Sequence, residues 1–363
     1  MGEKLTVALF GYYSYGNLGD NLMAYLLSRH IKTLGHQPIV FTKSPEFMAG
    51  WDVELISDIT ALINQSDVIV FGGGGLLIPR RNLSSQQKDF NDDLGAAVRA
   101  ATAKGIPQLG ISLGGAGKSL EQIAPIERHN LVRALKYVTL RNSEDVQLLE
   151  QAGIQGAFHN DMVWTTADKV PVSRGSGNGR RRIGFNLYLT QSRRYKLLRK
   201  ILQIIVRLRP DLDFVFLEIH PGPNGAFKAF APKRLPKNCT RKTLADVEDA
   251  CREAASLDLL VSTRLHLGVM TMSYGGTTIA YAGQEKTRLL YKRIGRESLF
   301  WESPNLLRFL RCFLLPGALA KTIAIGRSND VSEGMRDAHQ HYVKLTEALA
   351  TIPPQAKNET HDG

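Results

Sequence analysis

The chain has 363 residues, 43% of them hydrophobic, so it is long enough for two domains with buried cores. Lysine and arginine outnumber aspartate and glutamate by 46 to 34, which gives a formal net charge of +12. This composition excludes a disordered or fibrous protein, and the charge favours an anionic partner: a nucleic acid, an anionic membrane face, or a phosphorylated or acidic substrate.

The first 170 residues alternate short apolar runs with longer amphipathic stretches. The runs are almost continuously apolar, as in DVIVF at 67–71, which is typical of parallel strands covered by helices on both faces. We expect strands at 5–10, 38–41, 53–56, 67–71, 107–112, 137–140 and 157–159. We expect helices at 22–34, 91–104, 126–135 and 143–152.

Residues 171–182 (PVSRGSGNGRRR) have no apolar periodicity and predict a linker. The alternation then restarts and ends near residue 300. We expect strands at 183–189, 212–219, 258–262 and 277–281, and helices at 194–208, 243–255, 265–274 and 286–294. Helices at 305–315 and 331–350 follow, and the tail 351–363 is expected to be disordered.

Two successive series of strands and helices predict an α/β protein with two Rossmann-like domains facing a cleft. The domains are expected over residues 1–170 and 183–300, with C-terminal helices over 301–350. In open α/β sheets, ligands bind outside the carboxyl ends of the strands. Glycine-rich and polar clusters that directly follow a strand are therefore the candidates for a binding site.

The first such cluster, FGYYSYGNLGD at 10–20, follows the first strand. Glycines allow a tight turn and close approach of other groups, and Asp20 suits the N-cap of the next helix. A capped turn accounts for Asp20 and Gly19 but accounts less well for Gly16 and Asn17. Because part of the cluster is left unexplained, we treat all four residues as candidate substrate-binding residues. The spacing is not G-x-G-x-x-G and predicts no nicotinamide cofactor.

Four consecutive glycines at 72–75 follow the strand at 67–71. Successive unencumbered amides can hold an anion, and the alternative is a tight turn crossed by another backbone segment. Four glycines exceed what a turn requires, so we predict that Gly73, Gly74 and Gly75 contact an anionic substrate. For SLGGAG at 112–117, a turn and a ligand contact are equally compatible with the sequence.

Two charged residues follow later strands of the first series. Arg141 comes directly after the strand at 137–140 and is expected to point toward the cleft, with a surface salt bridge to Glu144 as the alternative. Asp161 follows the run ending at His159, where most aspartates form caps or turns, and we include it among the candidate substrate-binding residues.

The second series carries DLLVSTRLH at 258–266, which places Arg264 and His266 after a strand. Arginine supplies a planar fork for phosphate or carboxylate, and histidine exchanges protons near neutral pH. We predict that both residues are catalytic, together with Arg141, and we place His220 and Lys286 in the substrate site. Lys286 begins a helix, where the helix dipole disfavours a cation and an anionic partner would compensate.

The chain resembles the polysaccharide pyruvyl transferase family in GYYSYGNLGD, VFGGGGLL, TLRNSED followed by LLEQAG, Asp161 after FHN, and STRLHLGVM, over roughly residues 7–295 in the family's order. The resemblance implies a glycosyltransferase-B-like fold and transfer of the enolpyruvyl unit of phosphoenolpyruvate onto a sugar, giving a pyruvate ketal. It implies that Arg264, His266 and Arg141 lie at the phosphoenolpyruvate site.

The chain departs from the family pattern on the acceptor side. Many members carry Arg-Asp where this chain has Arg141-Asn142, and acidic residues where it has Pro-Arg-Arg at 79–81. We expect phosphoenolpyruvate as the donor and a saccharide acceptor, free or lipid-linked, with no resident cofactor or metal. A nucleotide-sugar-dependent glycosyltransferase of the same fold is the alternative.

A basic nucleic-acid-binding protein is a further rival, but the basic residues are scattered and no nucleic-acid-binding module is visible, so we expect no nucleic acid partner. Residues 305–321 mix leucines and phenylalanines with arginines, which is compatible with peripheral contact to an anionic membrane or with packing on the second domain. Three cysteines, an odd number, fit no metal-binding spacing. We therefore expect a cytoplasmic protein, at the inner face of the membrane if that contact forms.

Overall fold

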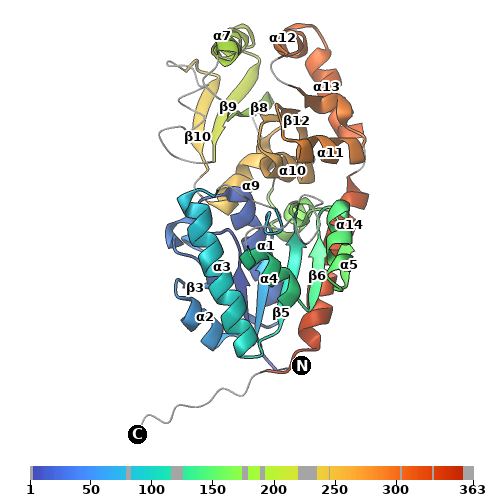
Figure 1. Cartoon of the computed structure of the whole chain (residues 1–363). Coiled ribbons are helices and arrows are strands. Elements are labelled where there is room, and N and C mark those ends of the chain that lie inside the picture. The colour runs from blue at the N-terminus through green and yellow to red at the C-terminus, as the bar shows by residue number, and fades with distance from the viewer. Residues whose placement is uncertain are drawn as a thin grey trace. The chain divides into compact units, whose positions relative to one another are not determined.

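The computed structural model describes residues 3–78, 83–115, 126–173, 179–188, 193–219, 235–244, 246–302, 305–328 and 331–354, without the side chains of 193–195. The chain forms two compact units (Figure 1). Unit 1 consists of Met1–Tyr15, Asp20–Met162 and Asp337–Gly363, and unit 2 of Gly16–Gly19 and Val163–Arg336.

Unit 1 is built on a parallel seven-stranded sheet with the order β3-β2-β1-β4-β5-β6-β7. The order reverses between β1 and β4, where Ala8 is paired with Ile69 and, on its other side, with Ile39. The strands are β1 (Thr6–Phe10), β2 (Gln37–Phe41), β3 (Glu54–Ile56), β4 (Val68–Gly72), β5 (Gln108–Leu113), β6 (Tyr137–Leu140) and β7 (Gly156–Phe158).

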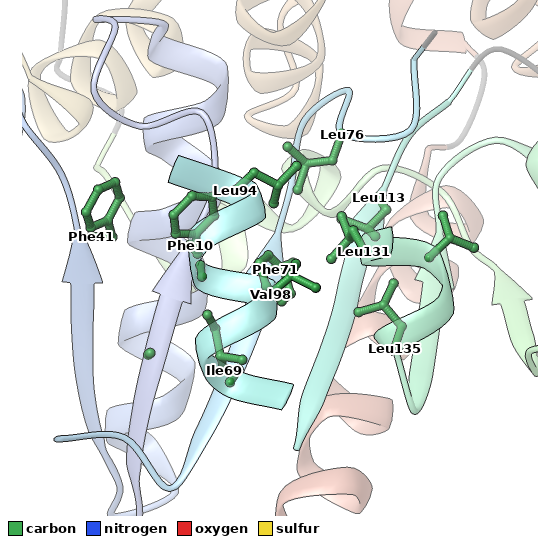
Figure 2. Close-up of a cluster of buried hydrophobic side chains, with 14 of the residues drawn as sticks. Phe10, Phe41, Ile69, Phe71, Leu76, Leu94, Val98, Leu113, Leu131 and Leu135 are labelled. Carbon is green, nitrogen blue, oxygen red and sulfur yellow. The ribbon is translucent and has the colours of Figure 1, made fainter. Parts of the chain in front are cut away.

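Helices cover this sheet on both faces, as expected for strands such as VIVFG that are buried throughout. They are α1 (Leu18–Thr33), α2 (Ile59–Gln65), α3 (Ser85–Ala103), α4 (Ile126–Ala134), α5 (Val146–Gln151) and α14 (Ser332–Ala350), with 3₁₀ turns at Pro45–Met48 and Ser143–Asp145. Figure 2 shows one core, where α3 and α4 pack against the sheet and Phe10 stacks on Phe41 at 5.0 Å between ring centroids.

Unit 2 repeats the same topology with a parallel six-stranded sheet of order β10-β9-β8-β11-β12-β13. The strands are β8 (Arg181–Asn186), β9 (Leu212–Glu218), β10 (Cys239–Thr243), β11 (Leu259–Ser262), β12 (Thr277–Tyr281) and β13 (Phe300–Trp301). The helices are α6 (Thr166–Lys169), α7 (Arg193–Leu208), α9 (Val247–Ser256), α10 (Leu265–Ser273), α11 (Glu285–Arg293), α12 (Leu306–Leu314) and α13 (Ala318–Ser328), with 3₁₀ turns at Met162–Thr165 and Glu297–Leu299.

The predicted α/β class and the two Rossmann-like sheets are confirmed, with some differences in detail. Strands β10 and β13 were not predicted. Strand β10 is a partly exposed edge strand of sequence CTRKT, and β13 is two residues long, so neither has the apolar run that identifies a buried strand. Helix α3 starts at Ser85 rather than 91, because Ser84 and Gln87 form a capping box.

The two units are also divided at other positions than the sequence analysis expects. The chain passes from unit 1 to unit 2 at Val163, before the predicted linker, whose last two residues already belong to β8. Helix α14 begins in unit 2 and continues into unit 1 from Asp337. Its buried face of Ala338, His341, Tyr342, Leu345 and Leu349 accounts for this return. Most of the predicted tail, 355–363, lies outside the described residues.

Among the described helices, none is long and apolar enough by itself to cross a membrane. Helices α12 and α13 meet the length and composition criteria only as a pair, and they are bent by 99° relative to each other.

Candidate active site

A pocket of about 130 Å³ lies in unit 2 at the carboxyl ends of β9, β11 and β12, where the sheet topology predicts a ligand site. Its lining residues are Asn17, Leu18, Gly19, Ile219, Thr263, Arg264, Leu265, His266, Leu267, Gln284, Lys286 and Thr287. The segment 17–19 is remote in sequence but belongs to the same compact unit. Five of the predicted site residues, Asn17, Gly19, Arg264, His266 and Lys286, are therefore brought into one pocket.

Arg264 occupies the N-cap position of α10, directly after β11. Its backbone amide donates to Ser262 Oγ at 2.9 Å, which fixes the start of the helix. Its guanidinium carbon lies 4.9 Å from the centre of the Tyr188 ring, and no described carboxylate forms an ion pair with it. Burial lowers the pKa of the Arg264 guanidinium below its usual value. A partly desolvated cation without a carboxylate partner is a site where an anionic ligand is favourable.

His266 lies in the first turn of α10 and packs against the glycine-rich turn of 16–19. A Cβ atom at Gly19 would overlap the imidazole ring of His266. The Gly19 amide donates to Asn17 Oδ1 at 3.3 Å, and Gly16 adopts a left-handed conformation with φ of +65°. The two glycines thus have separate roles: Gly16 allows the turn, and Gly19 leaves room for the imidazole.

Lys286 is exposed at the rim of the pocket, in the first turn of α11. The loop before it contains Ala282 in a left-handed conformation with φ of +47°, which is strained for a residue with a Cβ atom. None of the described lining residues is an aspartate or a glutamate. The charged groups of this pocket can therefore only attract an anion. His220 lies outside the described residues, next to the lining residue Ile219.

The carboxyl edge of the sheet in unit 1 carries the glycine-rich turn after β4. Gly73 and Gly74 adopt left-handed conformations, with φ of +66° and +78°. No described residue accepts a hydrogen bond from the backbone amides of Gly74, Gly75 or Leu76. Consecutive amides of this kind form a concave anion-binding turn. However, a Cβ at Gly74 would lie 2.7 Å from Asp20 Oδ1, so this turn faces a carboxylate as well.

The opposite side of the same turn is held by a residue that the sequence analysis missed. Arg128, in α4, is 2% exposed, and its Nη1 donates to the carbonyl oxygens of Gly75, Leu76 and Ile78 at 2.9–3.1 Å. Its Nε donates to Asn91 Oδ1 at 3.0 Å. Three carbonyls held by one guanidinium fix the shape of the turn. Nothing in the local sequence of α4 indicates this role.

Arg141 follows β6, as predicted, but it is paired within unit 1. Its Nη1 lies 2.9 Å from Asp161 Oδ2, and the Arg141 side chain is 8% exposed. The expected alternative, a surface salt bridge to Glu144, is wrong, because the guanidinium turns inward toward Asp161. A Cβ at Gly114 would lie 2.5 Å from Arg141 Nε, so the glycine at this position accommodates the arginine side chain.

Helix α14 holds the segment that presents Asp161. Asp337 accepts from the backbone amide of Asn160 at 2.6 Å and contacts His159 Nδ1 at 3.0 Å. His341 bonds the Asn160 carbonyl through Nε2 at 2.9 Å, and its Nδ1 lies 2.7 Å from Thr139 Oγ1. Complete burial, together with the nearby imidazole of His159, lowers the pKa of His341 to about 4, so this ring is neutral at pH 7. Sequence spacing gives no sign of this network, because α14 lies far along the chain.

The predicted site residues thus form two groups, one in each unit. Asn17, Gly19, Arg264, His266 and Lys286 line the pocket of unit 2, and Gly16 shapes the turn behind it. The residues of unit 1 are Asp20, Gly73, Gly74, Gly75, Arg141 and Asp161. Convergence of the two groups on one ligand across a cleft stays a prediction.

Solved structures with the same architecture are nucleotide-sugar enzymes of low sequence identity. A putative UDP-N-acetylglucosamine 2-epimerase from Listeria monocytogenes has a TM-score of 0.61 and 11% identity, covering 98% of this chain and 100% of that one. The epimerase from Methanocaldococcus jannaschii has a TM-score of 0.60 and 12% identity, with coverage of 96% and 99%. That from Neisseria meningitidis, bound to UDP-GlcNAc, has a TM-score of 0.58 and 11% identity, with coverage of 95% and 100%. These similarities show a two-domain GT-B fold.

A comparison with curated proteins finds no match. A family model described as polysaccharide pyruvyl transferase matches residues 17–285, which include the glycine-rich turns and the Arg264–His266 segment. Because this match extends over most of the chain's length, the chain belongs to the polysaccharide pyruvyl transferase family.

Proposed function

We propose that the protein transfers the enolpyruvyl unit of phosphoenolpyruvate onto a sugar of a polysaccharide or of its lipid-linked precursor, forming a pyruvate ketal. The observation that carries this proposal is Arg264: a partly desolvated guanidinium without a described carboxylate partner, in a pocket that no described acidic residue lines. Phosphoenolpyruvate is small and carries both a phosphate and a carboxylate. Family membership supports a transferase that acts on polysaccharide.

In the proposed donor complex, Arg264 and Lys286 bind the anionic groups of phosphoenolpyruvate, and His266 lies beside them. Arginine suits phosphate and carboxylate because its fork can donate two parallel hydrogen bonds. We assign Arg141 to the same substrate from unit 1, where its pairing with Asp161 orients the guanidinium. This part of the assignment depends on the two units approaching each other around the donor.

The proposed chemistry starts with protonation of the methylene carbon by His266. The neighbouring carbon becomes oxocarbenium-like, and a first sugar hydroxyl adds to it. Phosphate then leaves with cleavage of the carbon–oxygen bond, and a second hydroxyl adds to complete the ketal. Of the two hydroxyl protons released, one replaces the proton that His266 donated and the other leaves with phosphate. Arg264 stabilises the charge that develops on the departing phosphate.

A nucleotide-sugar-dependent glycosyltransferase is the second candidate, because the structural neighbours include an epimerase bound to UDP-GlcNAc. The pocket of unit 2 argues for the smaller donor. Its volume of about 130 Å³ is well below the roughly 300–1,000 Å³ of sites that enclose drug-sized ligands. That volume suits a small anion better than a nucleotide sugar.

The test is to incubate the protein with phosphoenolpyruvate and a panel of lipid-linked or nucleotide-linked sugars, and to measure phosphate release. We expect release only when a suitable acceptor is present. Phosphoenolpyruvate should also raise the melting temperature, since a ligand that binds only the folded state stabilises it. Arg264→Met should abolish this protection, whereas Arg252→Met, on the exposed side of α9, should retain it. Protection by UDP-sugars alone would contradict the proposal in favour of the second candidate.

A further inference from the structure

Large aliphatic side chains are exposed on two neighbouring helices of unit 2. Among the described residues, ten large hydrophobic side chains are exposed, and five of them belong to α7, α12 or the residue after α12. These five are Leu197, Ile204, Leu208, Leu307 and Leu315, with 48% to 65% of each exposed. Helices α7 and α12 pack against each other, as Figure 1 shows, and their inner faces share one core.

The exposed residues of α7 recur every three or four positions and so occupy one face of the helix. This face alternates aliphatic and basic residues: Lys196, Leu197, Lys200, Ile204, Arg207 and Leu208. The opposite face is buried through Leu198, Ile201, Leu202, Ile205 and Val206. A surface helix in a globular protein normally pairs one apolar face with a polar one. Helix α7 instead carries aliphatic side chains on both faces.

The charge of the two helices has a single sign. Helix α7 contains six lysines and arginines and α12 contains two, and neither contains an aspartate or a glutamate. A groove of about 520 Å³ lies at their C-terminal ends and is lined by Arg180, Arg181 and Arg209 beside Leu315. Two carboxylates lie close to these arginines: Asp211 pairs with Arg209, and Asp213 lies 3.6 Å from Arg180.

We propose that unit 2 docks on an anionic phospholipid bilayer through this α7–α12 surface, made of Lys196, Leu197, Lys200, Ile204, Arg207, Leu208, Leu307, Arg311 and Leu315. Leucine and isoleucine enter the boundary between headgroups and acyl chains, and the long basic side chains extend to the phosphates. The interleaving of the two residue types selects a membrane, since a nucleic acid would use the cations but leave the aliphatic side chains in water.

The proposal is independent of the proposed reaction, because none of these residues lines the pocket of Arg264. Docking would hold the enzyme on the surface where lipid-linked sugars reside. It would also account for part of the net charge of +12. The arrangement is peripheral: the helices lie on the bilayer and do not span it.

The experiment is flotation of the full chain with vesicles of phosphatidylcholine alone or of phosphatidylcholine with phosphatidylglycerol. We expect binding to the anionic vesicles, weakened by high salt, and little binding to the neutral ones. A charge variant, Lys196→Glu, Lys200→Glu and Arg207→Glu, should lower the partition coefficient by about 100-fold or more, since each basic residue near the surface contributes about 1 kcal/mol.

An aliphatic variant, Leu197→Gln, Ile204→Gln and Leu208→Gln, should also lose most binding although its charge is unchanged. The matched control is Leu289→Gln with Lys292→Glu. Both residues are exposed on α11, which is not part of the α7–α12 surface, so this variant should bind vesicles as the unaltered protein does. All these side chains are exposed, so urea unfolding should show little change in stability.

Three results would overturn the proposal. The first is failure to float with anionic vesicles at low salt. The second is full binding by the aliphatic variant, which would indicate a purely electrostatic contact such as that with nucleic acid. The third is a dimer in solution that the aliphatic variant converts to monomers, with no vesicle binding, which would assign the surface to a second copy of the chain.

Discussion

The two sheets share one topology, and each carries an arginine directly after a strand, yet the two arginines have opposite surroundings. Arg141 follows β6 and pairs with Asp161 at 2.9 Å. Arg264 follows β11 and lies over the Tyr188 ring without a described carboxylate partner. In unit 1 the charge is balanced within the protein, whereas in unit 2 it is left for a ligand. Position at the end of a strand thus identifies candidates, and the partner of each side chain shows whether its charge is already balanced within the protein.

This difference has an energetic consequence. A buried charge pair is costly to break, because removal of one member leaves the other desolvated and unpaired. A desolvated cation with no counter-charge already costs stability, and its removal relieves that cost. Side chains of the first kind help to hold the fold together whether or not they also contact a ligand, and those of the second kind are retained for function. Substitutions at both kinds of site can test this contrast.

The largest effect is expected for His266→Ala, which tests whether this residue of unit 2 acts as the proton donor. We expect phosphate release from phosphoenolpyruvate to fall by about 10²–10⁴-fold, the usual contribution of one placed acid or base, with the fold unchanged. The control is His129→Ala in α4 of unit 1, which should retain activity. Near-normal turnover by His266→Ala would remove this residue from the mechanism.

The second test compares Arg141→Met with Arg264→Met in urea unfolding. Arg141→Met removes the cation that pairs with Asp161, whose side chain is only 12% exposed, and should lower the free energy of unfolding by about 3 kcal/mol. Arg264→Met should cause no loss, or a small gain, while abolishing protection by phosphoenolpyruvate. Equal losses from the two substitutions would contradict the distinction between the units.

The third test concerns the neutral His341 that supports the Arg141–Asp161 pair. Its pKa is about 4 in the folded protein, against an ordinary value of 6.5, so the unfolded state binds the proton first as the pH falls. Stability is therefore lost between pH 6.5 and pH 4, by about 3 kcal/mol in total.

The variant for this test is His341→Gln. It should show a flatter decline of stability over the same pH range, measured by urea unfolding at a series of pH values. The carboxylates of Asp161 and Asp337 titrate in both proteins, so the quantity to compare is the difference between the two curves. Identical pH dependence would show that His341 does not act as a buried neutral ring.

The smallest expected effect is that of Gly19→Ala. The new methyl group would overlap the imidazole of His266 and displace it, and a shift of about 1 Å can cost about 10²-fold in activity. The check is a double-variant cycle. Gly19→Ala should have little further effect in a His266→Ala background, because the smaller side chain removes the overlap. Additive losses would place Gly19 in a different role.

Much of the fold could be predicted from local pattern. The almost continuously apolar runs of β1, β4 and β11 identified buried parallel strands, and the turn residues after β11 marked the sheet edge where the pocket lies. The strands that were missed lack a continuous apolar run, because β10 is largely polar and partly exposed and β13 is only two residues long. Arg128, Asp337 and His341 escaped sequence analysis because their partners lie far along the chain.

The amino-acid sequence alone specifies the alternation of strands and helices, the α/β class, and the set of polar residues and glycines that follow the strands. It could do so because burial and periodicity are local properties. The folded structure was needed to show that Arg141 pairs with Asp161, that Gly19 leaves room for His266 in unit 2, and that α14 returns to support unit 1. These outcomes depend on contacts between segments that lie far apart in the chain, such as His341 and Thr139, which are separated by 202 residues. Such contacts are set by how the helices and strands pack, and local pattern does not encode them.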